Sequence, residues 1–323
     1  PRAVLQGPVA TAVAGANDRG RTVRVHVSRF RSFAIMPTEN APDLRDWIGR
    51  GETAHDVARV APALGLAATL DRADLIVRLP TPGAVLPPSW HWLFFLPTAV
   101  QSALGPDGHP TRGGFLPPVT LLRRMWAGSR LAFPAAIAFD APLERTSTIA
   151  SVEHKSGRSG ELVLVTVRHE IRANGVLAVT DEHDIVYRQA PQRGAPPAPP
   201  AAADPARAVD FRRTVTPDPV LLFRYSALTF NGHRIHYDRS YVTGVEGYPG
   251  LVVHGPLQAT LLLDLLDRHL PGARVASFTF RARAPVFDTA PFDVCGAREG
   301  STVRLWTLTP DGRIAMDALA QLA

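Results

Sequence analysis

The chain has 323 residues, of which 46% are hydrophobic and 20% are charged, and it carries a formal net charge of +6. This is the composition and length of a globular protein of about two domains, so it excludes a chain that is disordered throughout. The sequence lacks the uninterrupted apolar run of roughly 20 residues that a membrane-spanning helix needs, and its arginines are scattered without interleaved aromatic residues. We therefore expect neither a membrane nor a nucleic acid as a partner.

The first 42 residues differ in composition from the rest of the chain. They contain six arginines, only two acidic residues, Asp18 and Glu39, and no clear hydrophobic period. They also lack the apolar segment of a secretory signal. We interpret residues 1–42 as a poorly structured N-terminal extension, with Met36 as a candidate start. Cys295 is the only cysteine, which excludes an intramolecular disulfide and favours a cytoplasmic protein.

The next segment, residues 43–188, is predicted to contain one helix followed by strands. Pro62 opens an apolar segment that extends to Arg72, and the first helical position is the preferred place for proline in a helix. Four apolar runs follow, and we predict strands at 131–139, 143–152, 162–171 and 176–187. Asn174-Gly175, between the last two, is a strong signal for a hairpin turn.

Residues 189–210 contain six prolines and no aromatic residue, which predicts a semi-rigid, extended linker. Behind it, residues 211–323 repeat the order of the first half. Pro256 opens a helix that ends before Pro271 and is apolar on nearly every side, as buried helices are. Strands are predicted at 275–284, 292–297, 302–308 and 314–322, with a turn at Asp311-Gly312.

Both halves are thus predicted to be one helix followed by a meander of strands. Residues 138–144 of the first half also resemble residues 286–293 of the second, which indicates a degenerate internal repeat. We predict an α+β fold of the double hot-dog type, in which two long helices are each wrapped by an antiparallel sheet. Two unrelated α+β domains are the alternative.

The side chains that could carry chemistry are concentrated between Arg224 and Pro256, directly before the predicted buried helix. This segment holds three histidines, four tyrosines, Asn231 and Asp238. A helix N-terminus offers free N–H groups and a partial positive charge, and Gly255 at that end allows a ligand carbonyl to approach the backbone closely. A thioester carbonyl that gains negative charge during a reaction would be stabilised there.

Several runs of this sequence resemble the MaoC-like hydratases and dehydratases of the hot-dog fold. Those of the second half are TFNGHRIHYD at 229–238 and GLVVHG at 250–255. They are most similar to the branch that contains type 2 hydroxyacyl-thioester dehydratases and the mesaconyl-CoA and itaconyl-CoA hydratases. In the first half, LGPDGHP at 104–110, GGFLPP at 113–118 and RMWAG at 124–128 resemble the N-terminal half of the same branch. The resemblance covers about residues 43–323.

The resemblance implies a degenerate first half, residues 43–188, that closes the substrate channel, and a catalytic second half, residues 211–323. It implies His236 as the group that moves protons, because the ordinary pKa of histidine lies near neutrality. It also implies Gly255 as the group that binds the thioester carbonyl. These two residues would form the centre of the site.

The wider family has an aspartate at the position of Asn231. An amide only donates and accepts hydrogen bonds, so we assign Asn231 to positioning the water or holding His236. His233 either fills the gap that the missing aspartate leaves or is a hydrogen-bond partner. Tyr237 and His254 are the other supporting residues that we expect from this motif.

The residues that would bind the rest of the substrate are less sharply defined by sequence. Tyr248 either lines the acyl pocket or belongs to a turn. Arg281 and Arg283 alternate on one strand face and either meet the phosphates of coenzyme A or face solvent. The aromatic run at 90–95 either lines an acyl tunnel or belongs to the core.

Together these features predict an acyl-CoA hydratase that adds water reversibly to a small branched enoyl-CoA such as mesaconyl-CoA or itaconyl-CoA. A 3-hydroxyacyl-thioester dehydratase of fatty-acid synthesis and a non-catalytic acyl-thioester-binding module are the alternatives. The chemistry requires no metal and no cofactor, since coenzyme A is part of the substrate. The family suggests that the chain also forms a homodimer.

Overall fold

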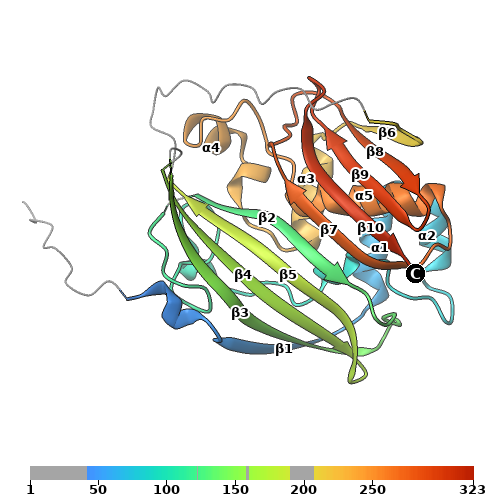
Figure 1. Cartoon of the computed structure of the whole chain (residues 1–323), viewed down its shortest axis with the longest axis horizontal. Coiled ribbons are helices and arrows are strands. Elements are labelled where there is room, and N and C mark those ends of the chain that lie inside the picture. Colours follow the sequence, from blue (N-terminus) through green and yellow to red (C-terminus); the bar gives the residue numbers. More distant parts are fainter. Residues whose placement is uncertain (1–41, 122, 158–159, 190–206) are drawn as a thin grey trace, which may run out of the picture. The chain divides into compact units, whose positions relative to one another are not determined.

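The computed structural model describes residues 42–121, 123–157, 160–189 and 207–323, whose strands form a ten-stranded antiparallel sheet (Figure 1). The strands of the first half are β1 (Gly51–Val57), β2 (Arg123–Ala132), β3 (Pro142–Gly157), β4 (Gly160–Ala173) and β5 (Val176–Arg188). Those of the second half are β6 (Phe211–Val215), β7 (Val275–Ala282), β8 (Phe292–Glu299), β9 (Thr302–Leu308) and β10 (Ile314–Leu322). Across the sheet they follow the order β1-β3-β4-β5-β2-β7-β10-β9-β8-β6.

This order is symmetric about the seam between β2 and β7. On one side β2 is followed by β5, β4, β3 and β1, and on the other side β7 is followed by β10, β9, β8 and β6. Each strand of the first half therefore has a counterpart in the second half. At the seam, antiparallel pairing matches Gly128 with Arg281 and Ala132 with Ser277. The two halves thus share one continuous sheet, as expected for a double hot-dog.

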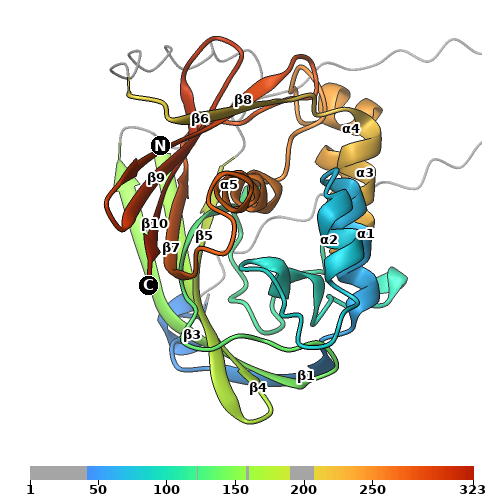
Figure 2. The same cartoon turned by 90° about the vertical axis from the view of Figure 1, so that its right-hand side faces the viewer.

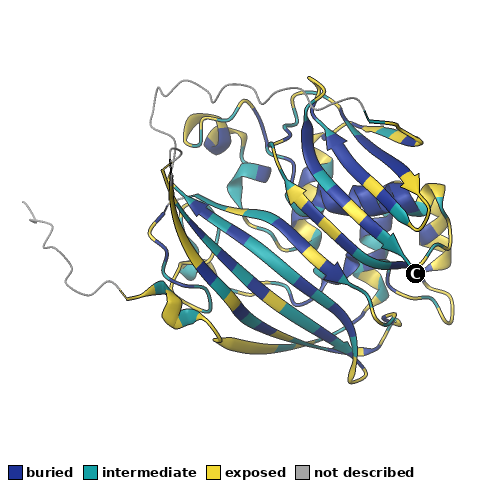
Figure 3. Cartoon of the chain, in the orientation of Figure 1, coloured by how far each residue is buried: buried dark blue, intermediate teal, exposed yellow. Residues whose placement is uncertain are grey.

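The long helix α5 (Gly255–His269) is the central element of the second half. Ten consecutive residues, from Leu257 to Leu266, are buried (Figure 3). Figure 2 looks along this helix and shows the strands β6 to β10 curving around it. The nearly uniform apolar surface of the helix is explained by this position, because the sheet and the first half contact it from different sides.

The first half has no long helix in the corresponding place among its described residues. α1 (Val60–Thr69) packs beside α2 (Ala73–Arg78) and α3 (Pro219–Leu228), so it matches α3 and not α5. The counterpart of α5 is the single 3-10 turn η2 (Trp90–Leu93). The fold class is confirmed, but the first of the two predicted long helices is reduced to this turn.

The internal repeat explains the correspondence of η2 with α5. The Leu86 N–H donates to the Ile137 carbonyl at 2.8 Å, and the Val253 N–H donates to the Val286 carbonyl at 2.8 Å. In both halves the segment after this contact leads into the central element. After Leu86, two prolines without N–H groups and Ser89, at a φ of 69°, prevent a regular helix.

Seven of the eight predicted strands are present. Those predicted at 143–152, 162–171, 176–187 and 292–297 extend further, those at 302–308 and 314–322 have the predicted bounds, and the one at 275–284 ends at Ala282. The strand predicted at 131–139 is wrong, because β2 begins at Arg123 and ends at Ala132. The Phe133 N–H then donates to the Ala276 carbonyl, and Pro134 follows. The short strands β1 and β6 were not predicted. Asn174 and Gly175 both have positive φ, 50° and 80°, as a two-residue hairpin turn of type I′ requires.

The remaining elements are short. They are η1 (Leu44–Trp47), η3 (Gln101–Ala103), η4 (Arg234–His236) and α4 (Arg239–Gly244). Residues 1–41 of the predicted extension and 190–206 of the predicted linker lie outside the described residues. Among the helices that the structure describes, none has the length and apolar character needed to cross a bilayer.

A buried network of charges connects the two halves beside α5. The Asp264 carboxylate of α5, 1% exposed, accepts hydrogen bonds from Arg72 Nη1 at 2.7 Å, Arg213 Nη1 at 2.9 Å and Arg268 Nε at 2.8 Å. Arg72 belongs to the first half and is itself 5% exposed. The halves are therefore held together by a charge network as well as by the seam.

Candidate active site

The loop between α3 and α4 carries the histidine motif and is shaped by its own polar side chains. The Asn231 side-chain oxygen accepts the His233 N–H at 3.0 Å, which fixes the entry into η4. Asp238 caps α4 by accepting the Tyr241 N–H at 3.0 Å, and Arg234 donates to the same carboxylate. The loop therefore turns His236 toward the interior.

His236 is buried and held in one tautomer. Its Nδ1 lies 2.7 Å from the Val252 carbonyl, which only accepts hydrogen bonds, so Nδ1 carries the hydrogen and Nε2 has a free lone pair. Burial lowers the pKa of His236 to about 4, despite the favourable hydrogen bond to Val252. At neutral pH the ring is therefore neutral and its Nε2 is a proton acceptor.

His254 supports this ring from one side. The two imidazoles stack with centroids 3.7 Å apart and planes 19° apart, and His254 is fully buried. Its Nε2 lies 2.8 Å from the Ser226 hydroxyl. Burial lowers the pKa of His254 well below its usual value, so the pair is uncharged.

Gly255 follows His254 directly and is the first residue of α5. The N–H groups in the first turn of a helix lack partners within the helix. A side chain at Gly255 would lie 3.8 Å from the Trp126 carbonyl of β2, so the helix N-terminus approaches the first half here. The stack of His236 on His254, the residue before Gly255, thus brings the proton acceptor close to the N-terminus of α5.

A loop of the first half, residues 104–110, is docked onto the histidine motif. The Arg234 N–H donates to the Asp107 carbonyl at 2.9 Å, and Arg234 Nη1 donates to the Pro106 carbonyl at 2.9 Å. Gly108 has a φ of +88°, and a side chain there would collide with the Gly232 carbonyl. Only glycine allows this close approach of the two backbones.

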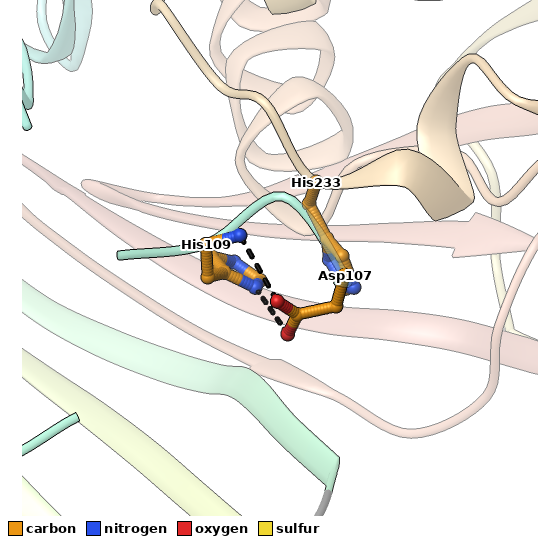
Figure 4. Close-up of side chains that lie close together, drawn as sticks. All are labelled: Asp107, His109 and His233. Carbon is orange, nitrogen blue, oxygen red and sulfur yellow. Dashed lines mark hydrogen bonds and ion pairs between the residues drawn. The ribbon is translucent and has the colours of Figure 1, made fainter. Parts of the chain in front are cut away.

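This docking places Asp107 and His109 beside His233 (Figure 4). The Asp107 carboxylate accepts the His109 N–H at 3.0 Å and lies 3.1 Å from His109 Nδ1. The rings of His109 and His233 are 4.1 Å apart, and those of His233 and His236 are 5.4 Å apart, edge to face. A continuous cluster of imidazoles therefore connects the first half with His236.

The charges of this cluster are shaped by its burial. Burial, together with the neighbouring His109 and His236, lowers the pKa of His233 to about 2. Burial also lowers the pKa of His109, while the hydrogen bond to Asp107 raises it. Although burial acts to raise the pKa of Asp107, the hydrogen bonds from His109 hold it below its usual range, so Asp107 is an anion.

The other predicted residues lie outside the cluster. Tyr237 is 47% exposed, and its hydroxyl donates to the Gly232 carbonyl at 3.0 Å. Tyr248 packs against Phe287, and its hydroxyl accepts from Arg123 at 3.2 Å. The two predicted phosphate ligands, Arg281 at the end of β7 and Arg283 just after it, are both exposed. Arg283 pairs with Asp317 at 2.7 Å. The aromatic run at 90–95 belongs mainly to the core.

Asp107 and His109 belong to a run that resembles the family, but the sequence does not predict them as site residues. Their position in the site depends on contacts with residues more than 120 positions away. A local signal exists, since Asp107-Gly108-His109-Pro110 is a short polar turn with a glycine at positive φ. Nothing in the sequence alone indicates where that turn docks.

The comparisons with known proteins identify the family and the fold. A family model described as hydroxyacyl-thioester dehydratase type 2 matches residues 89–288. A mesaconyl-C(4)-CoA hydratase from Chloroflexus aurantiacus is 47% identical over 284 residues, which are 88% of this chain and 99% of that protein. The structural relatives include a MaoC-like dehydratase from Phytophthora capsici, with a TM-score of 0.63 and 15% identity over 86% of this chain and 97% of that one. A double hot-dog protein from Mycobacterium tuberculosis has a TM-score of 0.51 and 15% identity over 87% of this chain and 98% of its own.

Proposed function

Since the chain belongs to the hydroxyacyl-thioester dehydratase type 2 family of MaoC-like hot-dog hydratases and dehydratases, we propose that it is an acyl-CoA hydratase acting on mesaconyl-C4-CoA. The observation that carries this proposal is the buried neutral His236, with its Nε2 free, beside the N-terminus of α5. A 47% identical relative named for this activity supports the choice of substrate.

The reaction adds the oxygen of water to the β carbon of the conjugated thioester and a proton to the α carbon. His236 takes a proton from the attacking water at Nε2, because Nδ1 already carries a hydrogen. The electron pair of the double bond moves toward the thioester carbonyl, whose oxygen accepts the Gly255 N–H at the start of α5. The Asn231 side chain fixes the loop that holds His236. No cofactor takes part in this scheme.

The proposal is tested with a panel of purified thioesters. We expect rapid loss of the enoyl-thioester absorbance with mesaconyl-C4-CoA, and slower turnover of itaconyl-CoA, crotonyl-CoA and longer enoyl-CoAs. Preference for long 3-hydroxyacyl thioesters in the reverse direction would instead identify a dehydratase of fatty-acid synthesis. Binding of acyl-CoA without turnover of any substrate would identify a non-catalytic module.

Arg124 supports a substrate that carries a free carboxylate. It lies on β2 opposite Tyr187 of β5, and its positive charge lowers the pKa of both His109 and His233, so it lies near the cluster. The neighbouring Arg123 pairs with Glu246 at 3.1 Å, whereas no carboxylate of the described residues pairs with Arg124. A guanidinium without an ion pair beside the site fits the second carboxylate of a mesaconyl group.

Replacing Arg124 with methionine should raise KM for mesaconyl-C4-CoA by about 10- to 100-fold, the usual effect of losing a hydrogen bond to a charged group. KM for crotonyl-CoA, which has no second carboxylate, should change less than about twofold. Arg130→Met on the same strand is the matched control, because Arg130 pairs with Glu182 and Asp184 on the exposed face. Equal losses on both substrates would contradict the assignment.

A further inference from the structure

The histidine cluster contains one carboxylate, and it comes from the first half. Within the described part of the chain, Asp107 is the only acidic group that is hydrogen-bonded to a member of this cluster. It raises the pKa of His109 and of His233. For His236 and His254, burial and neighbouring histidines dominate, and no acidic group opposes them. The imidazoles of the cluster therefore differ in how well each could hold a positive charge: those of His109, His233, His236 and His254.

A proton taken from water gives the cluster one positive charge, and its position has a large energetic consequence. On His236 that charge would be buried against the neutral ring of His254, without a counterion. On His109 it would lie 3.1 Å from an anionic carboxylate oxygen. A close opposite charge favours the charged form of a group, and burial without one disfavours it. The cationic state is therefore more stable at His109 than at His236.

We propose that Asp107 and His109 of the first half form the proton-holding pair of the active site, connected to His236 through His233. The inference rests on the proposed hydratase function and adds a role for the first half. His236 accepts the proton, and the Asp107–His109 pair stabilises it until it is returned. Asp107 and His109 are positioning residues in this scheme, because they act through the other imidazoles.

The proposed step is a proton transfer only. As the water oxygen bonds to the β carbon, one water proton moves to Nε2 of His236 and the electron pair of the double bond moves to the thioester enolate. The proton passes from His236 by way of His233 to His109. The rings are 5.4 Å and 4.1 Å apart between centroids and share no direct hydrogen bond, so each transfer needs a bridging water molecule or a rotation of the His233 ring. The return of one proton by the same route protonates the α carbon. The imidazoles are then neutral again, and the net change is the addition of one water molecule.

The charges around Asp107 and His109 favour a protonated His109 over a bound metal ion at this position. The ligating atoms of Asp107, His109 and His233 lie within 4.8 Å of one another, a spacing that a divalent cation would accept. However, Arg112 and Arg124 face His109 and lower its pKa by their positive charge. Two nearby guanidinium groups raise the energy of a divalent cation at this position much more than that of a single proton.

Asp107→Asn is the variant that isolates the charge. The asparagine side-chain oxygen can still accept the His109 N–H, so the turn at 107–109 is preserved. We expect kcat to fall at least about 100-fold, within the usual range for proton-transfer groups, with KM changed less than about threefold. Since the carboxylate raises the pKa of His109, its removal should also move the acid limb of the kcat–pH profile to lower pH.

The control is Asp140→Asn, because Asp140 is an exposed aspartate that pairs with Arg59 away from the cluster. Wild-type activity on mesaconyl-C4-CoA is measured first, so that failure of the proposed function is separated from failure of this inference. If wild type is active and Asp107→Asn keeps its kcat and its pH profile, the pair plays no part in proton transfer. Stoichiometric Zn²⁺ binding that requires Asp107, together with loss of wild-type activity in chelator, would also overturn the inference in favour of a metal site.

Discussion

Replacing His236 with glutamine should lower kcat for hydration of mesaconyl-C4-CoA by about 10²- to 10⁴-fold, the range found for general acid–base groups. The glutamine side chain can donate a hydrogen bond toward the Val252 carbonyl, as Nδ1 of His236 does, but it cannot take up a proton. The main loss should therefore fall on kcat and not on KM. Steady-state kinetics at several pH values would measure both.

The matched control for this variant is His55→Gln, because the His55 side chain is 71% exposed on β1 and lies outside the cluster. It should keep the activity of wild type. Thermal unfolding should confirm that His236→Gln remains folded. A His236→Gln protein that is folded and retains kcat within about tenfold of wild type would rule out His236 as the acceptor of the water proton.

The largest effect on stability is expected for Asp264→Ala. This carboxylate is buried in α5 and pairs with Arg72, Arg213 and Arg268. Arg72 keeps Asp74 and Asp267 as partners when Asp264 is removed, so the charges left without a carboxylate are those of Arg213 and Arg268. Removal of one partner of a buried ion pair leaves an uncompensated charge and costs about 3–5 kcal/mol. We expect a loss of this size in the free energy of unfolding, measured by urea denaturation.

Glu153→Ala provides the comparison for this stability measurement. Glu153 pairs with Lys155 at 3.0 Å, but both side chains are more than half exposed, and such pairs contribute about 0–1 kcal/mol. A loss for Asp264→Ala no larger than that for Glu153→Ala would mean that the arginines find water or other partners. In that case the network would not hold the halves together.

The strand meanders were predictable because alternation of apolar and polar residues is a local signal. The error at β2 has a physical cause. The apolar residues at 133–139 pack against the core as an irregular segment after the end of β2, while Arg123 to Arg130 carries too many polar residues to show a strand pattern. A strand at the seam between two halves has neighbours on both sides, so its identity depends on contacts that a local pattern does not contain.

The candidate site also contains some residues that the sequence places close together and others that only folding brings together. His236, His254 and Gly255 lie in one short stretch of chain, and their proximity to a helix N-terminus could be read from the sequence. Asp107 and His109 are brought to them only by folding. Tyr237 shares the motif but is 47% exposed, because it directly follows His236 at the end of η4, and adjacent residues of a 3-10 turn point about 120° apart.

The seam between β2 and β7 has a consequence for how the site is assembled. Asp107 lies on one half and His233 on the other, and both halves belong to one polypeptide joined through a continuous sheet. Their encounter is intramolecular, so it is governed by an effective concentration and not by the amount of protein in solution. Dilution therefore cannot separate the two halves of this cluster, as it could in a site formed by two independent hot-dog subunits.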